Sequence, residues 1–326
     1  MGWLTNRLLS IPARETLVSR RGFQVREPAV AARLESIGQT FLCGYHAALR
    51  HRGGADLAHS LMAIDSELHG FAFEGAGMAL TLLDRMAPIN RGYLHRFLAG
   101  DGAPHIYMLH VGAGWAMARL PWLRRRVDAF VATLHPLARW LALDGYGFHQ
   151  GYFYWPESVR RQQVPRGVAG YARRAFDQGL GRSLWFVEGA DTPRIAAAIS
   201  AFPQSRQADL WSGVGLACAY AGGVDRRRLE FLREAAGPYL AQAAQGAAFA
   251  AKARARAGNP AHQTDLACGV FCGIPAHAAA AVTDDALDDL PPDGAVPAYE
   301  TWRRRIQERL LVTGRHSCQP AGGLMR

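Results

Sequence analysis

Five short segments of the 326-residue chain share a Gly-x-Gly motif that recurs at an almost constant interval. The pairs are Gly75/Gly77, Gly112/Gly114, Gly145/Gly147, Gly179/Gly181 and Gly213/Gly215, and their first glycines lie 37, 33, 34 and 34 residues apart. Such a step is the length of a helix–turn–helix repeat of the tetratricopeptide kind. Because one such unit cannot bury its apolar face alone, the units stack into a solenoid. The sequence therefore predicts a mainly α fold, with hairpin repeats of about 34 residues stacked into an α/α solenoid that is open, curved or closed.

The positions four and eight residues after each first glycine are small and then usually apolar. Offsets of 0, 4 and 8 lie on one face of a helix, and small residues there let two helices approach closely. We therefore interpret the glycines as sites of close helix packing, despite a helix-propensity cost of about 1 kcal/mol each. The alternative is that they are loop glycines just before a helix. The two columns are Ala79, Ala116, His149, Ser183 and Ala217, then Leu83, Leu120, Phe153, Val187 and Ala221.

The rest of the chain is also expected to be helical, because strand-like alternation is sparse. Residues 237–258 are Ala-rich and end at Gly258, just before Asn259-Pro260, which is typical of a helix with a C-terminal stop. Residues 299–311 predict a closing amphipathic helix. We expect one all-α domain over 1–326, with N-terminal helices in 1–68, the Gly-x-Gly core in 69–223 and C-terminal helices in 224–326.

The composition favours a globular protein with a basic surface. Hydrophobic residues make up 49% of the chain and the formal net charge is +10, almost entirely from arginine, since Lys252 is the only lysine. Such a surface favours acidic partners: nucleic acid, anionic lipid, or an acidic carrier protein such as an acyl carrier protein. The N-terminus is too polar for a secretory signal, no apolar run of about 18 residues occurs, and the five cysteines are scattered. We therefore expect a cytoplasmic protein without a membrane span.

Several common functional motifs are missing. The chain has no phosphate-binding loop, dinucleotide-binding fingerprint, G-x-S-x-G or H-E-x-x-H motif, so we expect no nucleotide cofactor and no standard serine hydrolase. Cys268 and Cys272, with His262 and His277 nearby, offer a weak zinc pattern, but buried apolar cysteines are the simpler interpretation and we expect no metal. The arginine runs 124–126, 226–228 and 303–305 lack interleaved aromatic residues. We interpret them as solvated helix faces and expect no nucleic acid.

Four residues are candidates for a functional site. Two of them depart from their repeat columns, and the other two are acidic residues directly before a glycine pair. His149 occupies the small-residue column, and Arg182 stands where the other copies have Met78, Trp115, Phe148 and Leu216. The residues before the glycines are mostly polar, and helix N-capping is the first explanation for them. They are Glu74, Val111, Asp144, Gln178 and Ser212.

The candidate catalytic residues are therefore His149, Glu74, Arg182 and Asp144, lining the inner wall of the solenoid. His149 would act as acid or base near neutral pH, and Arg182 would hold a carboxylate, phosphate or thioester carbonyl. The alternative is structural: a hydrogen-bonded core histidine, and an arginine paired with Glu74 or another acid. Aromatic residues are dense here, and several on one concave surface would suit a long, apolar, unsaturated ligand. They are Phe148, Tyr152, Phe153, Tyr154, Trp155, Trp185, Phe186, Trp211 and Tyr220.

Four longer segments, 69–84, 143–153, 176–191 and 208–223, resemble the UnbL-like family of uncharacterised proteins, which is associated with gene clusters for enediyne polyketide biosynthesis. The resemblance implies a cytoplasmic accessory protein of polyketide tailoring or core maturation. Its substrate would be a long polyene attached to an acidic carrier protein. The resemblance supplies no catalytic residues.

Three functions follow as hypotheses. The first is an enzyme or substrate chaperone that acts on a polyene or polyketide intermediate. The second is a non-catalytic helical-repeat scaffold that binds an acidic partner protein. The third, an isoprenoid cyclase, depends on the acidic segment 284–289, which a Pro-containing loop follows directly.

Overall fold

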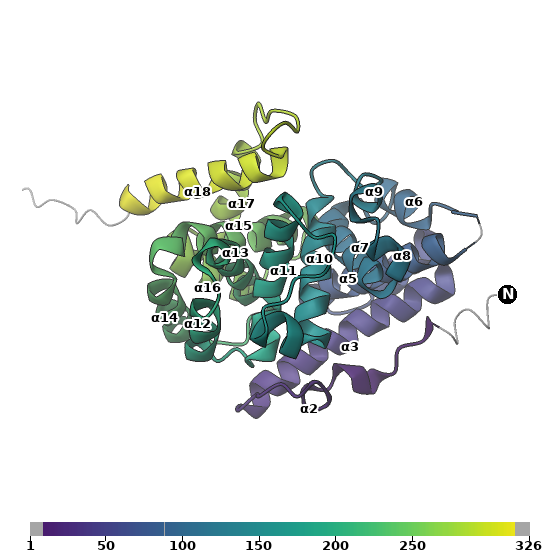
Figure 1. Cartoon of the computed structure of the whole chain (residues 1–326), viewed down its shortest axis with the longest axis horizontal. Helices are drawn as coiled ribbons and strands as arrows, with labels where there is room; N and C mark the ends of the chain where they lie inside the picture. Colours follow the sequence, from purple (N-terminus) through teal and green to yellow (C-terminus); the bar gives the residue numbers. More distant parts are fainter. Residues whose placement is uncertain (1–8, 88, 317–326) are drawn as a thin grey trace, which may run out of the picture.

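The computed structural model describes residues 9–87 and 89–316, and in these residues all regular structure is helical (Figure 1). The five Gly-x-Gly pairs lie in five helices, with one long helix before them and one after. Each of these seven helices packs against the next one in chain order, and we call them the inner helices. They are α3 (Pro28–His51), α5 (His69–Met86), α7 (Ile106–Arg119), α10 (Trp140–Phe153), α11 (Tyr171–Val187), α13 (Gln204–Ala221) and α15 (Leu240–Ala257).

Neighbouring inner helices run parallel. Between α11 and α13, Arg174 contacts Asp209, Ser212 donates to Gln178, and Trp185 donates to the carbonyl of Gly222. The paired positions rise together along both helices, which only a parallel pair allows. Shorter helices lie outside this row, in the connections that bring the chain back from the end of one inner helix to the start of the next. They are α4 (Gly54–Met62), α6 (Tyr93–Ala99), α8 (Pro121–Arg124), α9 (Val127–Val131), α12 (Thr192–Ser200) and α14 (Arg226–Ala236).

The Gly-x-Gly pairs lie inside the inner helices, so the loop interpretation is wrong. In each pair the first glycine touches the backbone of the preceding inner helix and the second touches that of the next. A Cβ atom on Gly145 would overlap the carbonyl oxygen of Val111 in α7, and one on Gly147 would overlap that of Phe176 in α11. Residues two apart are separated by about 200° around a helix. One pair therefore opens both flanks of its helix to close packing.

The row of inner helices curls, so that its end lies against its beginning. Arg33 Nε in α3 donates to the carbonyl of Ala221 at the end of α13, at 3.1 Å. The rings of Phe71 in α5 and Tyr220 in α13 lie 5.2 Å apart. Arg254 Nη1 in α15 donates to the carbonyl of Glu67, at 3.1 Å. An interior is thereby enclosed between the first and the last inner helices.

Both helices predicted in the C-terminal part of the chain are confirmed. Helix α15 ends at Gly258, which adopts the left-handed conformation (φ 65°), as the Gly258 stop predicts. The closing helix is α18 (Ala298–His316), which packs against α15 and α17 (Ala276–Asp285). Gly269 in α16 (His262–Phe271) makes no close backbone contact, so this segment is not a further copy of the repeat. Of the predicted domain, residues 1–8, 88 and 317–326 lie outside the described residues.

Within the described residues, no one helix combines the length and apolarity needed to cross a membrane. Helices α16 and α17 meet that requirement only together, as a pair bent by 68°.

The backbone contacts of the glycines predict that substitution by alanine destabilises the protein at Gly145 but not at Gly269. Gly145→Ala should lower the free energy of unfolding by roughly 1–3 kcal/mol or more, because its Cβ must displace the backbone of α7. Gly269→Ala is the matched control, because its Cβ would meet nothing closer than Arg226 Nη2 at 3.9 Å. It should leave stability unchanged or raise it by up to about 1 kcal/mol. Urea denaturation of both variants measures this, and equal effects would contradict the packing role.

Candidate functional site

The inner face of the repeat consists of the residues one before and three after each first glycine. These two positions are four apart and therefore lie on the same side of the helix. The position three residues on points into one cavity in all five Gly-x-Gly helices. This column is Met78, Trp115, Phe148, Arg182 and Leu216, and all five line the cavity, together with Phe41 of α3. The repeat therefore builds the wall of the cavity as well as the packing of the helices.

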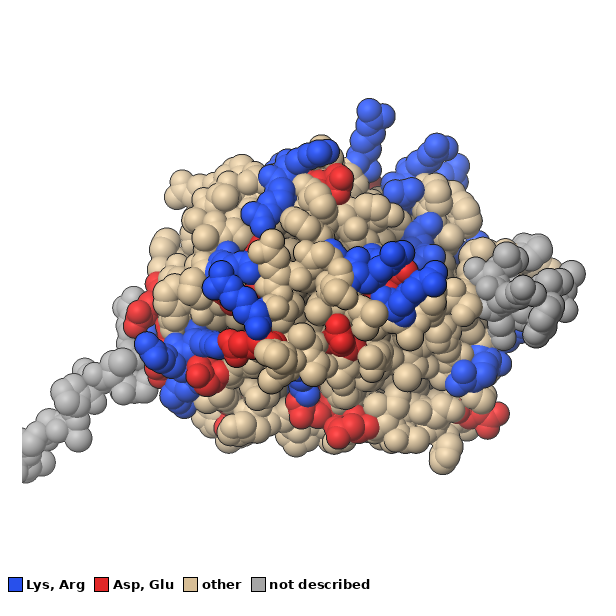
Figure 2. All heavy atoms as spheres, turned by 90° about the horizontal axis from the view of Figure 1, so that it is seen from below, with Lys and Arg blue, Asp and Glu red and all other residues tan. Residues whose placement is uncertain are grey.

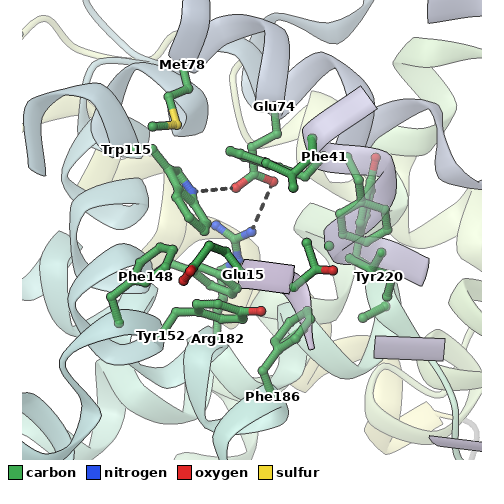
Figure 3. A pocket seen from close by; sticks show the side chains of 18 of the residues that line it. Glu15, Phe41, Glu74, Met78, Trp115, Phe148, Tyr152, Arg182, Phe186 and Tyr220 are labelled. Atoms are coloured by element: carbon green, nitrogen blue, oxygen red, sulfur yellow. Dashed lines mark hydrogen bonds and ion pairs between the residues drawn. The ribbon is translucent and has the colours of Figure 1, made fainter. Parts of the chain in front are cut away.

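The cavity is apolar, aromatic and narrow (Figure 3). It holds about 60 Å³, or about 770 Å³ when all empty space out to its open mouth is counted. As it stands it has room for a few water molecules, and a larger ligand requires side chains to move. Of the aromatic residues singled out in the sequence, five line it: Phe148, Tyr152, Phe153, Phe186 and Tyr220. The indoles of Trp155 and Trp185 instead donate to backbone carbonyls elsewhere, and Tyr154 is exposed.

Part of the wall comes from residues outside the two columns of the repeat. Phe41 of α3 and Phe71 of α5 contribute rings, and a segment near the N-terminus covers the mouth. This segment supplies Ile11 and Thr16, and it is held down farther along by Phe23, whose ring lies 5.0 Å from that of Tyr152. The sequence carried no signal for this cover, because the segment belongs to no repeat.

Three of the four predicted site residues meet at one side of the cavity. Glu74 of α5 and Arg182 of α11 point toward one another, with Arg182 Nη2 3.7 Å from Glu74 Oε2 (Figure 3). Trp115 Nε1 donates to Glu74 Oε1 at 2.8 Å. Arg182 Nη1 also donates a short hydrogen bond to Asp144 of α10. All three charged groups are buried, with at most 5% of each residue exposed.

Glu74 is the group of this cluster that can exchange a proton near neutral pH. Burial raises the pKa of its carboxyl from 4.5 to about 7, and Arg182 and the Trp115 hydrogen bond only partly offset this. The geometry explains why Arg182 does not do more: its close hydrogen bond goes to Asp144, and Glu74 lies 3.7 Å away. A carboxyl that titrates near pH 7 in an apolar cavity is typical of a general acid or base.

His149 does not share this wall, in contrast to the prediction. It lies beside Trp115, with ring centroids 5.4 Å apart, and is not among the residues that line the cavity. Burial, with smaller contributions from Arg119 and Arg124, lowers the pKa of its imidazole to about 3, so the ring is neutral. Its Nδ1 has no hydrogen-bond partner within the described part of the chain. His149 is thus a buried neutral ring behind the cavity wall.

The polar residues before the glycines are not helix caps, because they lie within their helices. They form a buried chain of hydrogen bonds across the interior instead. Gln178 Nε2 donates to Asp144 at 2.8 Å, and Ser212 Oγ contacts Gln178 at 3.3 Å and Gln245 at 3.0 Å. Arg303 Nε of α18 then donates to Gln245 at 3.1 Å. Arg303 is completely buried, so the expectation of a solvated face at 303–305 is wrong for this residue.

Two weaker patterns in the sequence do not line this cavity. The thiols of Cys268 and Cys272 contact the carbonyls of Ala247 and Ala244, and no cluster of three His, Cys, Asp or Glu residues suited to a metal occurs among residues 9–87 and 89–316. In the acidic segment, Asp284 forms an ion pair with Lys252.

The model of one protein family, described as "Protein of unknown function (DUF1702)", matches residues 1–310. The chain belongs to this family. Comparisons with curated proteins and with solved structures gave no match. The match to the DUF1702 family makes no connection with UnbL-like proteins or enediyne gene clusters, and that resemblance stays an expectation.

In this member of the DUF1702 family, the raised pKa of Glu74 predicts a pH-dependent loss of stability. The folded protein holds the proton up to about pH 7, whereas the unfolded chain releases it near 4.5. The stabilising contribution is therefore complete below pH 4.5 and is lost as the pH rises through 7. Glu74→Gln should gain roughly 1–3 kcal/mol of unfolding free energy relative to wild type between pH 5 and pH 8. Denaturation at both pH values measures this, with exposed Glu230→Gln as the control. A difference that does not change with pH would contradict the assignment.

Proposed function

We propose that the protein binds an elongated, apolar, unsaturated ligand in the aromatic cavity and transforms it by proton transfer at Glu74. The observation that carries the proposal is a carboxyl with a pKa of about 7 facing a permanently charged guanidinium inside an aromatic wall. Aromatic rings suit a flat, conjugated chain, and one ion pair in such a wall suits one carbonyl oxygen on that chain.

Each residue of the cluster has a role in this proposal. Arg182 donates hydrogen bonds to the ligand's carbonyl oxygen, and Glu74 removes a proton from a saturated carbon next to the double bonds that are conjugated with that carbonyl. The electrons of the C–H bond move to the oxygen as a dienolate, which Arg182 stabilises. Glu74 then returns the proton to another carbon of the chain, so that a double bond shifts with no net oxidation. Asp144 is a positioning residue that holds Arg182, and His149 is a positioning residue that supports Trp115.

The resemblance to UnbL-like proteins gives this ligand a biological source. We propose a polyene or polyketide intermediate of enediyne biosynthesis, presented in the cytoplasm on an acidic carrier protein. Each inner helix would then be the inner arm of one hairpin, in a solenoid that curls until its two ends touch. The contact of Arg33 with Ala221 supports this arrangement.

Three variants distinguish ligand binding from proton transfer. Phe186→Trp narrows the cavity and should weaken binding of the methyl ester of the fluorescent tetraene cis-parinaric acid at least tenfold, while the same change at exposed Phe231 should leave it unchanged. Glu74→Gln should keep binding within about threefold yet fail to restore the missing metabolite in a host strain that lacks the gene. Mass spectrometry of the strain measures this. Full restoration of the metabolite by Glu74→Gln would contradict the acid–base role of Glu74. Tight binding of the probe by Phe186→Trp would contradict binding in this cavity.

A second function, docking of an acidic partner without catalysis, is favoured by exposed arginines that lie close in sequence to the cavity residue Arg119. Arg119 lines the cavity and is exposed, and Arg124, Arg125 and Arg126 follow it on the surface beside half-exposed Trp122. Basic side chains also form groups on the face of the molecule shown in Figure 2. These arginines would attract an acidic carrier protein, which is compatible with the first proposal, because a carrier bound beside Arg119 would present its tethered chain to the cavity.

Replacement of Arg124, Arg125 and Arg126 by serine should slow association with an acyl carrier protein about tenfold at 50 mM salt. The difference between wild type and variant should shrink at 500 mM salt, because screening removes the attraction. Arg226, Arg227 and Arg228, replaced in the same way, are the control for net charge. Surface plasmon resonance gives the rates. Equal slowing in both triple variants would show a general charge effect and contradict a docking site at these arginines.

A further inference from the structure

A second, smaller cavity lies on the other side of Arg182. It holds about 40 Å³, or about 470 Å³ with its mouth, and α7, α10, α13, α15 and α18 supply its wall. The wall is apolar and aromatic, since Tyr107, Phe249, Tyr299 and Trp302 face it. Lys252 contributes its stem, while its ammonium group is paired with Asp284. None of the steps proposed above uses this cavity.

The two cavities belong to one inner surface. Arg182, Leu216 and Tyr220 line both of them. The repeat column that builds the first cavity continues into the second, because Phe249 stands three residues after Gly246, a glycine that touches the backbone of α13 as the other first glycines touch their preceding helices. Leu216 is only partly buried although it lies in the interior, because it faces both spaces. What divides them is a layer of side chains around one guanidinium.

The charges at the dividing layer restrict what can lie there. Glu74 lines the first cavity and Asp144 lines the second, with Arg182 between them. An anionic group on either side would meet a carboxylate, and a cation would meet Arg182. A neutral oxygen, such as a ketone or enol ether oxygen, can accept a hydrogen bond from the guanidinium without either repulsion.

We propose that one elongated ligand occupies both cavities, with an apolar arm in each and a neutral oxygen near its middle at Arg182. This inference rests on the proposed function, since it places the ligand of that site, and it adds the chemical class: a chain whose oxygen lies in the interior of the molecule instead of at one end. The arm in the second cavity lies against Phe249, Ala253 and Trp302.

Positional isomers of one ketone test the placement, because they share size and hydrophobicity. Binding of 8-pentadecanone and 2-pentadecanone is measured by displacement of the neutral dye N-phenyl-1-naphthylamine. Wild type should bind 8-pentadecanone about tenfold more tightly, because only this isomer carries an arm on each side of its oxygen. Ala253→Phe, which fills the second cavity, should abolish the preference, and Ala253→Leu should reduce it. Ala255→Phe, at an exposed position of the same helix, should retain it.

The short ketone 2-octanone separates this inference from the proposed function. It fits the first cavity alone, so its affinity should be the same in wild type and in Ala253→Phe, which also shows that the variant is folded. Equal affinities of the two pentadecanones in wild type, or a preference that survives in Ala253→Phe, would overturn the two-cavity ligand while 2-octanone binding keeps the first site intact. Failure of the dye and of every ketone to bind wild type would overturn the proposed function itself.

Discussion

The contact of one helix backbone with the next, made possible by glycine, is the constraint on which the rest of the structure depends. Each of the five central inner helices, α5 to α13, carries two glycines on opposite flanks, and each of these glycines lies against a backbone carbonyl of a neighbouring inner helix. Such contacts leave no freedom to change the spacing between helices. The residues one before and three after the first glycine are then forced onto the interior side. Fold and cavity wall are therefore two consequences of the same repeated Gly-x-Gly pattern.

Close packing also decides the electrostatics of the interior. Because the inner helices are near one another, polar side chains that point inward must find partners there and not in water. Asp144, Gln178, Ser212 and Gln245 do so from four successive helices. Arg182 has two carboxylates within reach and makes its short hydrogen bond to only one. Burial raises the pKa of the other carboxyl, Glu74, so that it holds its proton up to about pH 7.

Sequence reasoning found the helices, the close packing and three residues of the cluster, because these all follow from one period. It misplaced His149 for a geometric reason. His149 stands four residues after its first glycine, in line with that glycine, and so lies on the flank toward α7 beside Trp115. The cavity lies about 100° farther round the helix. The polar residues before the glycines were taken for N-caps because Asp and Ser favour caps, and a single sequence does not separate a cap from a buried polar side chain that finds its partner on another helix.

The sequence by itself determined that this chain forms helices in close contact, since a glycine pair at a fixed interval has few other uses in an α protein. It also determined which columns of side chains share a face. Only the tertiary structure decided that the row curls until α13 meets α3, that a segment before α3 covers the cavity, and that Arg182 takes Asp144 in preference to Glu74. These outcomes depend on small rotations added over seven helices and on distances between residues far apart in the chain, which no local pattern encodes.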